Sequence, residues 1–201
     1  MIKNIMLNSG SNVLIMFIKL AITFVMAPIL LKNLGAYDYG IWEVIGVVIG
    51  YMGMLDLGIK PAISRFVAVN DAQNNTNQQA ILYSTAFVFL FFVGLLLCCI
   101  FVFWGLWFPE SIANDKHSTE KYTFLGLIIG ARLAFVVPGY AAESVLEGKQ
   151  KYHIKNLVTL IISIIGSSLV YILITPKNGL LILAGVNAIG LSIKYLIYML
   201  I

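Results

Sequence analysis

Residues 31–68 read LKNLGAYDYGIWEVIGVVIGYMGMLDLGIKPAISRFVA. A turn at residues 34–40 ends one long apolar segment and begins another, and the second segment is interrupted by DLGIKP at residues 56–61. Charged residues and a Gly/Pro break are costly at membrane depth, because lipid offers no hydrogen-bond partners to freed backbone groups. They are tolerated where a segment lines a cavity or packs inside a bundle. The stretch therefore predicts a membrane protein with a polar interior.

The composition of the whole chain also points to the bilayer. Of its 201 residues, 60% are hydrophobic and 11% are charged, whereas soluble domains carry roughly 25% charged residues. The mean hydropathy is +0.94. The net charge of +4 comes from scattered basic residues, so we expect no nucleic-acid partner. Cys98 and Cys99 are adjacent, and His117 and His153 stand alone, so we expect no metal ion and no cofactor.

Six stretches are apolar over the roughly 20 residues that a spanning helix needs. They are residues 12–31, 40–69, 80–108, 122–146, 156–175 and 180–201. They predict an all-α polytopic membrane protein with one six-helix domain over residues 1–201. Lysines at positions 149, 151 and 155 favour a cytoplasmic N-terminus. The last stretch ends at Ile201 without a polar flank, which favours a chain that is part of a longer protein.

Three of the predicted helices carry a polar stripe that includes a cation. Offsets of seven and eleven residues place the members of each stripe on one helix face. The stripes are Asn12, Lys19 and Thr23 on the first helix, Arg132 and Glu143 on the fourth, and Asn187, Lys194 and Tyr198 on the sixth. The stripes predict a polar cavity between the helices.

Cations outnumber anions within the predicted spans. The five cations are Lys19, Lys60, Arg65, Arg132 and Lys194, and the three anions are Glu43, Asp56 and Glu143. A cation at the bilayer centre costs ~2.5–3.5 kcal/mol on insertion scales, so five of them favour an electropositive cavity for an anionic substrate. Alternative interpretations stay open. Lys60 and Arg65 can reach the membrane interface, Asp56 can pair with Lys60, and Glu43 can complement a helix start.

Small residues at helical spacing predict close helix packing. Gly46 and Gly50, and likewise Gly126 and Gly130, form GxxxG spacings. The fifth predicted helix has a milder stripe of small and polar residues, namely Thr159, Ser163, Gly166 and Ser167. We find no HExxH, GxSxG or P-loop motif, so we expect no enzymatic activity.

The order of the motifs resembles a known family. The matching residues are Leu34, Gly35, Tyr39, Gly40, Ile41 and Trp42, then residues 55–59, then residues 65–68, and after the fourth helix residues 146–152. Together they resemble the N-terminal part of the oligosaccharide and polysaccharide flippases, in the multidrug/oligosaccharidyl-lipid/polysaccharide exporter superfamily. The resemblance covers all six predicted helices in order.

The resemblance implies two six-helix lobes around a central cavity, of which this chain is one lobe and lacks the second. It implies a multi-pass protein of the cell membrane that moves a polyprenyl-pyrophosphate-linked oligosaccharide by alternating access, for a surface polysaccharide such as O-antigen or exopolysaccharide. The partners are then the anionic lipid-linked oligosaccharide, the bilayer, and a second lobe or a second copy of the chain.

The predicted site combines this implication with the polar stripes. We expect substrate contacts from Lys19, Arg65, Arg132 and Lys194. We expect cavity or gating roles for Asn12, Glu43, Asp56, Glu143 and Asn187. Two alternatives are a drug or cation exporter of the same superfamily, against which Lys19 on the first helix argues, and a non-transporting remnant of a longer protein.

Overall fold

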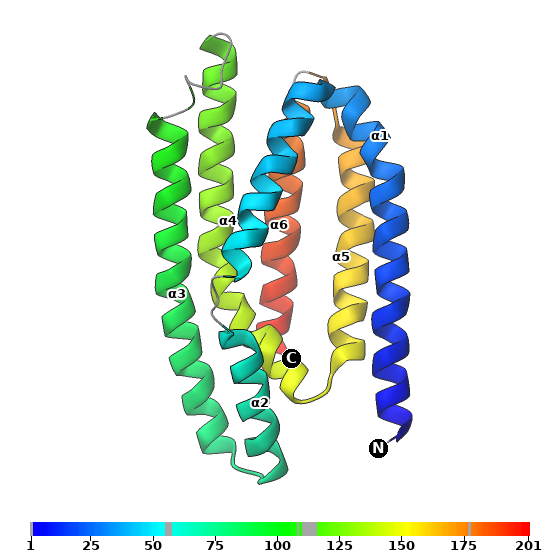
Figure 1. Ribbon diagram of the computed structural model, residues 1–201, viewed down its shortest axis with the longest axis vertical. Coiled ribbons are helices and arrows are strands. Elements are labelled where there is room, and N and C mark those ends of the chain that lie inside the picture. The colour runs from blue at the N-terminus through cyan, green and yellow to red at the C-terminus, as the bar shows by residue number, and fades with distance from the viewer. Residues whose placement is uncertain (1, 55–57, 108, 110–115, 177) are drawn as a thin grey trace.

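The described part of the chain, residues 2–54, 58–107, 109, 116–176 and 178–201 of a computed structural model, contains helices and no strands. The six helices form an upright bundle (Figure 1). They are α1 (Ile2–Met54), α2 (Ile59–Ala72), α3 (Thr76–Trp107), α4 (Lys116–Gly148), α5 (Tyr152–Leu173) and α6 (Gly179–Leu200). The predicted all-helical class is confirmed.

Five helices of the described residues are long and apolar enough to cross a membrane. Their candidate spans are Gly10–Tyr51, Thr76–Trp107, Thr119–Gly148, Tyr152–Leu173 and Gly179–Leu200. The chain is therefore a multi-pass helical membrane protein. α2 has 14 residues, which is shorter than the roughly 20 residues that a crossing requires.

The first predicted stretch and residues 40–54 of the second lie within α1, which bends back on itself at Gly35 (Figure 1). The backbone of Gly35 has φ 78° and ψ 164°, a conformation open to glycine because it has no Cβ. We call residues 2–34 the first limb of α1 and residues 36–54 its second limb. The turn predicted at residues 34–40 thus becomes a sharp bend between two helical limbs.

The second predicted stretch, residues 40–69 with its break at DLGIKP, is divided between two helices. α1 ends at Met54, and α2 begins at Ile59 after Gly58, whose φ of 79° is left-handed. A left-handed residue cannot continue a right-handed helix, so the chain changes direction there. Asp56, in the break itself, lies outside the described residues.

α3 and α4 approach each other most closely at their glycines. A Cβ on Gly126 would lie 2.7 Å from the Cα of Gly105, and one on Gly130 would lie 3.0 Å from the carbonyl oxygen of Cys98. The close packing predicted for Gly126 and Gly130 is therefore confirmed. At Gly46 and Gly50 a Cβ would meet no described atom within 4 Å, so that prediction was wrong for the helices described here.

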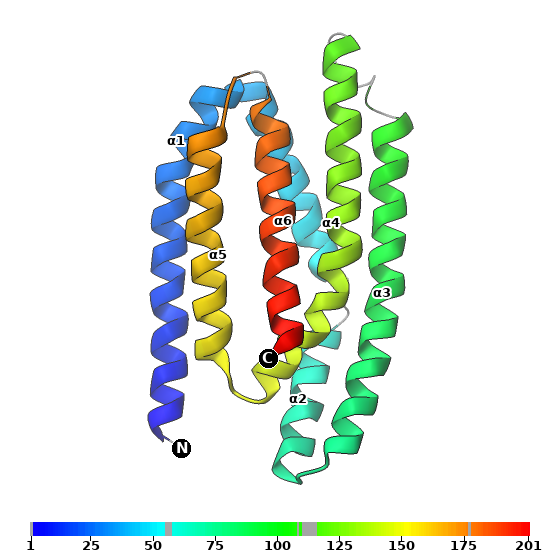
Figure 2. The ribbon, with the colours of Figure 1, turned by 180° about the vertical axis from the view of Figure 1, so that it is seen from behind.

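α4 is the most central helix, with α3 on one side and α6 on the other (Figure 1). Its Leu125 and Ile129 are among the most deeply buried side chains of the core. Gly139 lets Tyr195 of α6 approach, since a Cβ there would lie 2.5 Å from the Cβ of Tyr195. Seen from behind, α5 and α6 lie beside each other, with the first limb of α1 next to α5 (Figure 2).

A polar contact joins the bend of α1 to the start of α4. The Lys121 ammonium lies 2.7 Å and 3.0 Å from the two carboxylate oxygens of Asp38, and the Tyr122 hydroxyl donates a hydrogen bond of 2.9 Å to the same carboxylate. Tyr122 is 2% exposed. The contact therefore fixes the second limb of α1 near the bend.

The two GxxxG spacings supply a matched test of packing. Gly126→Ala places a methyl group against the backbone of α3, and we expect it to lower the free energy of unfolding by about 1–3 kcal/mol, the usual cost of overpacking. Gly46→Ala makes the same chemical change in open space and should leave stability unchanged or slightly raised. Thermal unfolding in detergent, followed by circular dichroism, measures both. Equal melting temperatures for the two variants would contradict the packing argument.

Candidate functional site

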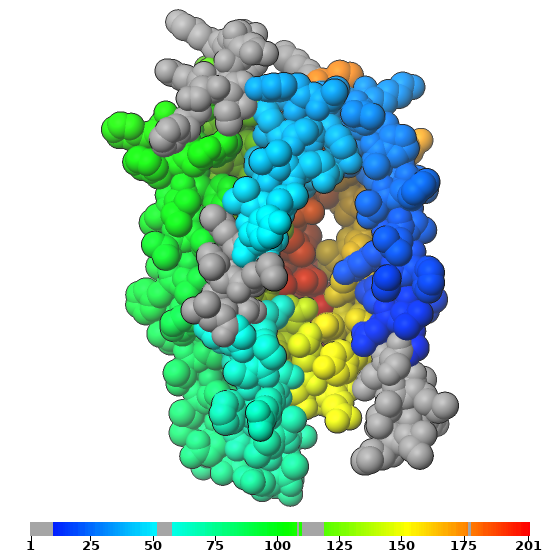
Figure 3. All heavy atoms as spheres, viewed as in Figure 1, coloured from blue at the N-terminus to red at the C-terminus, as the bar shows by residue number. Residues whose placement is uncertain are grey.

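A hollow of about 390 Å³ lies between the two limbs of α1 and the faces of α5 and α6. Figure 3 shows it as a depression bounded by both limbs, with α5 and α6 at its back. Each helix contributes residues three or four positions apart, which share one helix face. They include Lys19, Thr23 and Met26 of the first limb, Tyr39, Trp42 and Glu43 of the second, Ser163, Gly166 and Ser167 of α5, and Leu183, Asn187 and Leu191 of α6. We call this the α1/α5/α6 hollow.

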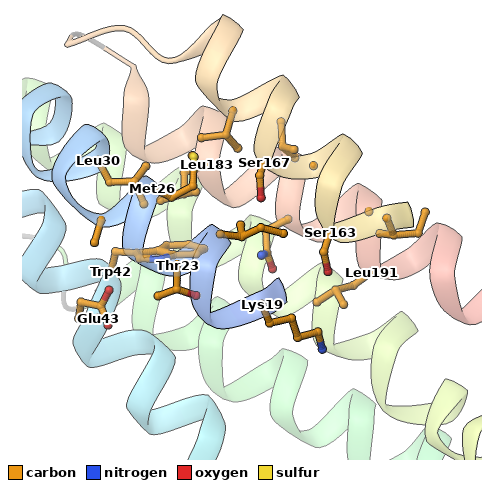
Figure 4. Close-up of a pocket in the computed structure, with 18 of the residues that line it drawn as sticks. Lys19, Thr23, Met26, Leu30, Trp42, Glu43, Ser163, Ser167, Leu183 and Leu191 are labelled. Atoms are coloured by element: carbon orange, nitrogen blue, oxygen red, sulfur yellow. The ribbon is translucent and has the colours of Figure 1, made fainter. Parts of the chain in front are cut away.

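The wall of the hollow is mostly apolar and carries separated polar groups. Figure 4 shows Thr23 between Lys19 and Trp42, and Ser163 and Ser167 on the facing helix α5. Lys19 and Glu43 are exposed at the rim, whereas Trp42 is half-buried. The arrangement is typical of small-molecule sites, in which a few placed polar groups orient a ligand against apolar walls.

Asn187 supplies an unsatisfied acceptor in this wall. Its Oδ1 is buried and accepts no hydrogen bond from any residue in the described ranges. A buried amide oxygen without a donor costs about 1–3 kcal/mol relative to a satisfied one. A ligand group that donates a hydrogen bond would therefore be favoured at this position.

A second polar site centres on the carboxylate of Glu143 in α4. Lys60 of α2 lies 3.0 Å from its Oε2, Lys155 of α5 lies 3.9 Å from its Oε1, and the Tyr195 hydroxyl of α6 donates a 3.3 Å hydrogen bond. Lys155 also pairs with Glu147 at 2.6 Å. Four helices therefore meet at one carboxylate, which is 9% exposed as a residue.

Lys194 completes this site without an anionic contact of its own. The residue is 8% exposed, and its ammonium lies 4.1 Å from the ring centre of Tyr195 and 5.6 Å from that of Tyr198. Within the described chain its ammonium has no carboxylate within 4.0 Å. Aromatic faces attract a cation but do not neutralise it. We call Lys60, Glu143, Lys155 and Lys194 the lysine cluster, in which three lysines surround one glutamate.

The lysine cluster and the hollow are electrostatically connected. Lys194 lies within electrostatic range of Glu143, Lys19, Lys60 and Lys155, with Glu143 attracting it and the other lysines repelling it. Because Lys19 lines the hollow, the positive potential of the cluster extends to the rim of the hollow.

Arg132 adds a further cation on α4. Its Nε is buried and donates no hydrogen bond to any described residue, and the phenols of Tyr140 and Tyr195 lie within electrostatic range of its guanidinium. Arg132 and Glu143, predicted to share a face, are thus both placed next to Tyr195, but they form no ion pair within the described chain.

Near the N-terminal end of the bundle a more open hollow of about 590 Å³ lies between α2, the first limb and the α4–α5 turn. Asn12, Lys60, Arg65 and Glu147 are among its lining residues. Asn12 also accepts a 2.6 Å hydrogen bond from Asn156 of α5. The structure therefore distributes the predicted site residues over neighbouring places rather than into one pocket.

The pairing considered for Lys60 from the sequence differs from the one observed. The neighbour at spacing four, Asp56, lies outside the described residues, and Lys60 instead contacts Glu143, 83 positions away in the sequence. Burial lowers the pKa of Lys60, but the adjacent Glu143 carboxylate outweighs burial, so the pKa lies above its ordinary value. Lys60 therefore carries its charge at neutral pH.

The small-residue stripe of α5 has a role other than close packing. A Cβ on Gly166 would meet no described atom within 4 Å, and Ser163 and Ser167 line the hollow. Thr159 shares a 2.7 Å hydrogen bond with the Tyr198 hydroxyl. Two residues of these sites were not predicted from the sequence. Lys155 falls in a predicted loop, and Trp42 was considered only as one of the residues that carry the family resemblance.

Among the described residues no three His, Cys, Asp or Glu side chains lie close enough together to hold a metal ion. The site presents ammonium, guanidinium, carboxylate and hydroxyl groups.

Comparison with known proteins gives one distant relative. Over 134 residues, 64% of this chain, the sequence is 27% identical to a Shigella flexneri protein named "Putative O-antigen transporter". The match spans 30% of the length of that relative. No family model and no solved structure matches the chain. The similarity supports a transporter-type protein of polysaccharide assembly at most.

The contact between Lys60 and Glu143 can be tested by removing one partner and then both. Lys60→Met leaves the carboxylate with Lys155 as its nearest cation, and we expect the free energy of unfolding to fall by about 2–3 kcal/mol. This is below most values for deeply buried pairs, ~3–5 kcal/mol, because the Lys60 side chain is 27% exposed.

The double variant Lys60→Met/Glu143→Met removes both charges and should recover much of that loss. Thermal unfolding in detergent compares the three proteins. If the double variant is less stable than Lys60→Met alone, the pair is not what makes the single substitution costly.

Proposed function

We propose that this chain is one lobe of a membrane transporter that moves a polyprenyl-pyrophosphate-linked oligosaccharide across the cell membrane by alternating access. The observation that supports the proposal is the surplus of buried cations. Lys194 and Arg132 lie inside spanning helices, and within the described ranges neither contacts a carboxylate.

A pyrophosphate can supply the negative charge that Lys194 and Arg132 lack among the described residues. An uncompensated cation inside a membrane span is costly and marks a substrate or ion pathway. A pyrophosphate carries several acceptor oxygens and at least two negative charges, so it can be shared by several ammonium and guanidinium groups. In the proposed role, Lys19, Arg132 and Lys194 hold the pyrophosphate, and Arg65 at the open hollow meets it first.

The proposed polar partners of these cations regulate the charge of the pathway. Glu143 neutralises part of the lysine cluster while no substrate is bound. Glu43 at the rim and Asn187 in the wall contact the rest of the ligand, and Asn12 and Asp56 contribute at the N-terminal end. The second lobe is supplied by another segment or chain, and the N-terminus lies in the cytoplasm.

The Shigella flexneri relative independently supports the proposal that this chain is a transporter. That protein is named as an O-antigen transporter, and O-antigen is a polysaccharide. The name is that of a protein more than three times the matched length, so the substrate assigned to this chain rests on the cations of the site.

Neutralising the proposed contacts should weaken the binding of an isoprenoid pyrophosphate. We expect Lys194→Gln and Arg132→Gln each to weaken the affinity for farnesyl pyrophosphate at least tenfold, because each removes a charge-assisted contact. Lys19→Gln should have a smaller effect of about threefold, because Lys19 is exposed at the rim. Native mass spectrometry of the chain in lipid nanodiscs measures the affinities.

Lys32→Gln is the matched control, since Lys32 is an exposed lysine of the same helix and lies outside the hollow. It should bind like the unaltered chain. Full affinity in Lys194→Gln, Arg132→Gln and Lys19→Gln would exclude this site as the pyrophosphate site.

Glu143 should compete with the substrate for the lysines. Glu143→Gln keeps the shape of the side chain and frees Lys60 from its carboxylate partner, while Lys155 keeps its contact with Glu147. We expect the affinity for farnesyl pyrophosphate to rise threefold or more, with a steeper dependence on salt concentration. A weaker affinity in a variant with unchanged melting temperature would show that Glu143 positions the lysines for the ligand instead.

A transporter of organic cations is the second candidate, and one observation favours it. Glu43 lies beside Tyr39 and Trp42 in the α1/α5/α6 hollow, and a carboxylate with aromatic neighbours suits a cationic ligand. Lys19 on the same hollow opposes it by repulsion. Binding of tetraphenylphosphonium that is lost in Glu43→Gln, together with no binding of farnesyl pyrophosphate, would favour this candidate.

A further inference from the structure

We propose that the α1/α5/α6 hollow binds a single uncharged sugar ring, the one bonded directly to the pyrophosphate, and that Trp42 and Asn187 select it. This inference rests on the proposed function and adds to it a saccharide site separate from the cations. The remaining sugars of the chain and the lipid lie outside the hollow.

The chemistry of the wall matches a sugar ring in both its apolar and its polar parts. A pyranose ring has an apolar face of C–H groups and a rim of hydroxyls that both donate and accept hydrogen bonds. The half-buried indole of Trp42 offers a flat apolar surface to such a face. Thr23, Ser163 and Ser167 place hydroxyls around it.

Asn187 points to a ligand that donates a hydrogen bond. Its Oδ1 is buried and unsatisfied by the described residues, although it lines a hollow within a spanning helix. A sugar hydroxyl donates the missing bond, whereas an acyl chain has no donor. The alternation of apolar and polar wall residues on the two limbs of α1, on α5 and on α6 therefore favours a polyol over a lipid tail.

The hollow has room for one sugar ring but not for a whole oligosaccharide. A volume of about 390 Å³ lies at the low end of the ~300–1,000 Å³ of small-molecule sites. The opening visible in Figure 3 leaves a path for the rest of a longer saccharide. Discrimination is therefore expected at one sugar and not along the whole oligosaccharide.

The position of the hollow identifies which sugar this is. Lys19 lines the hollow and lies within electrostatic range of Lys194 in the lysine cluster. In a pyrophosphate-linked saccharide the first ring is bonded to a phosphate oxygen at its anomeric carbon. A pyrophosphate held at Lys194 and Lys19 thus brings the first ring to the mouth of the hollow.

The experiment fills the hollow without disturbing the backbone. Gly166→Leu directs a side chain into the hollow from a position where a Cβ meets no described atom within 4 Å. Gly185→Leu is the matched control, because its Cβ also has open space and Gly185 is not part of the hollow. Asn187→Leu removes the acceptor and keeps a similar volume.

Two probes separate the sugar from the anion. The 201-residue chain in lipid nanodiscs is exposed to methyl glycosides of glucose, galactose, mannose and N-acetylglucosamine, and saturation-transfer NMR detects their binding. Farnesyl pyrophosphate is measured in parallel by native mass spectrometry. We expect a signal from at least one glycoside that falls at least tenfold in Gly166→Leu and Asn187→Leu and persists in Gly185→Leu. Gly185→Leu should bind farnesyl pyrophosphate as the unaltered chain does.

The outcomes distinguish the two proposals. The absence of a signal from every glycoside, or a signal that persists in Gly166→Leu, overturns the sugar site, whatever the anion does. Failure of farnesyl pyrophosphate to bind, with the glycoside signals intact, overturns the proposed function and leaves a saccharide site. Loss of the glycoside signal in Gly185→Leu as well would show a general loss of fold and would overturn the assignment to the hollow.

Discussion

Glu143 lies at the centre of the polar interior of the bundle and holds it together. The membrane-spanning helices around it are mostly apolar. Its carboxylate receives Lys60 from α2, Lys155 from α5 and the Tyr195 hydroxyl from α6, while it stands itself on α4. Three lysines near one another would repel strongly in a low-dielectric interior without an anion among them. The positions of these helices relative to one another thus depend on Glu143, with Glu147 as a second partner of Lys155, and the three lysines still outnumber these two carboxylates.

The rest of the architecture leaves space beside this charged centre. α3 and α4 pack through glycines with little room between them, whereas the two limbs of α1 diverge from the Gly35 bend around the α1/α5/α6 hollow (Figure 1). α1, α5 and α6 line the hollow with a mostly apolar wall that carries a few polar groups, and the large apolar side chains Phe24 and Ile172 are exposed to the surroundings. One half of the bundle is therefore densely packed, and the other encloses a place for a ligand.

Much of this fold is predictable from the sequence, because hydropathy alone locates helices in a membrane protein. The bend at Gly35 and the packing of Gly126 also follow from local signals. The partner of Lys60 does not, because the nearest acid in sequence is four residues away and the observed acid is 83 residues away. The way in which the helices pack in three dimensions decides which lysine contacts which carboxylate. Gly46 and Gly126 have the same spacing pattern, yet only Gly126 packs against another described helix, since spacing does not reveal which face meets a neighbour.

The contact of Asp38 with Lys121 and Tyr122 has a mechanical consequence. Among the described residues, the backbone of α1 packs against α5 and α6, while α4 reaches α1 through these side chains near the bend. The second limb is therefore like a beam clamped at one end. A beam of this kind is displaced least near its clamp, so a movement of the second limb would shift residues 46–54 more than Trp42 and Glu43. The mouth of the hollow can widen in this way without changing the surface that a ligand would touch.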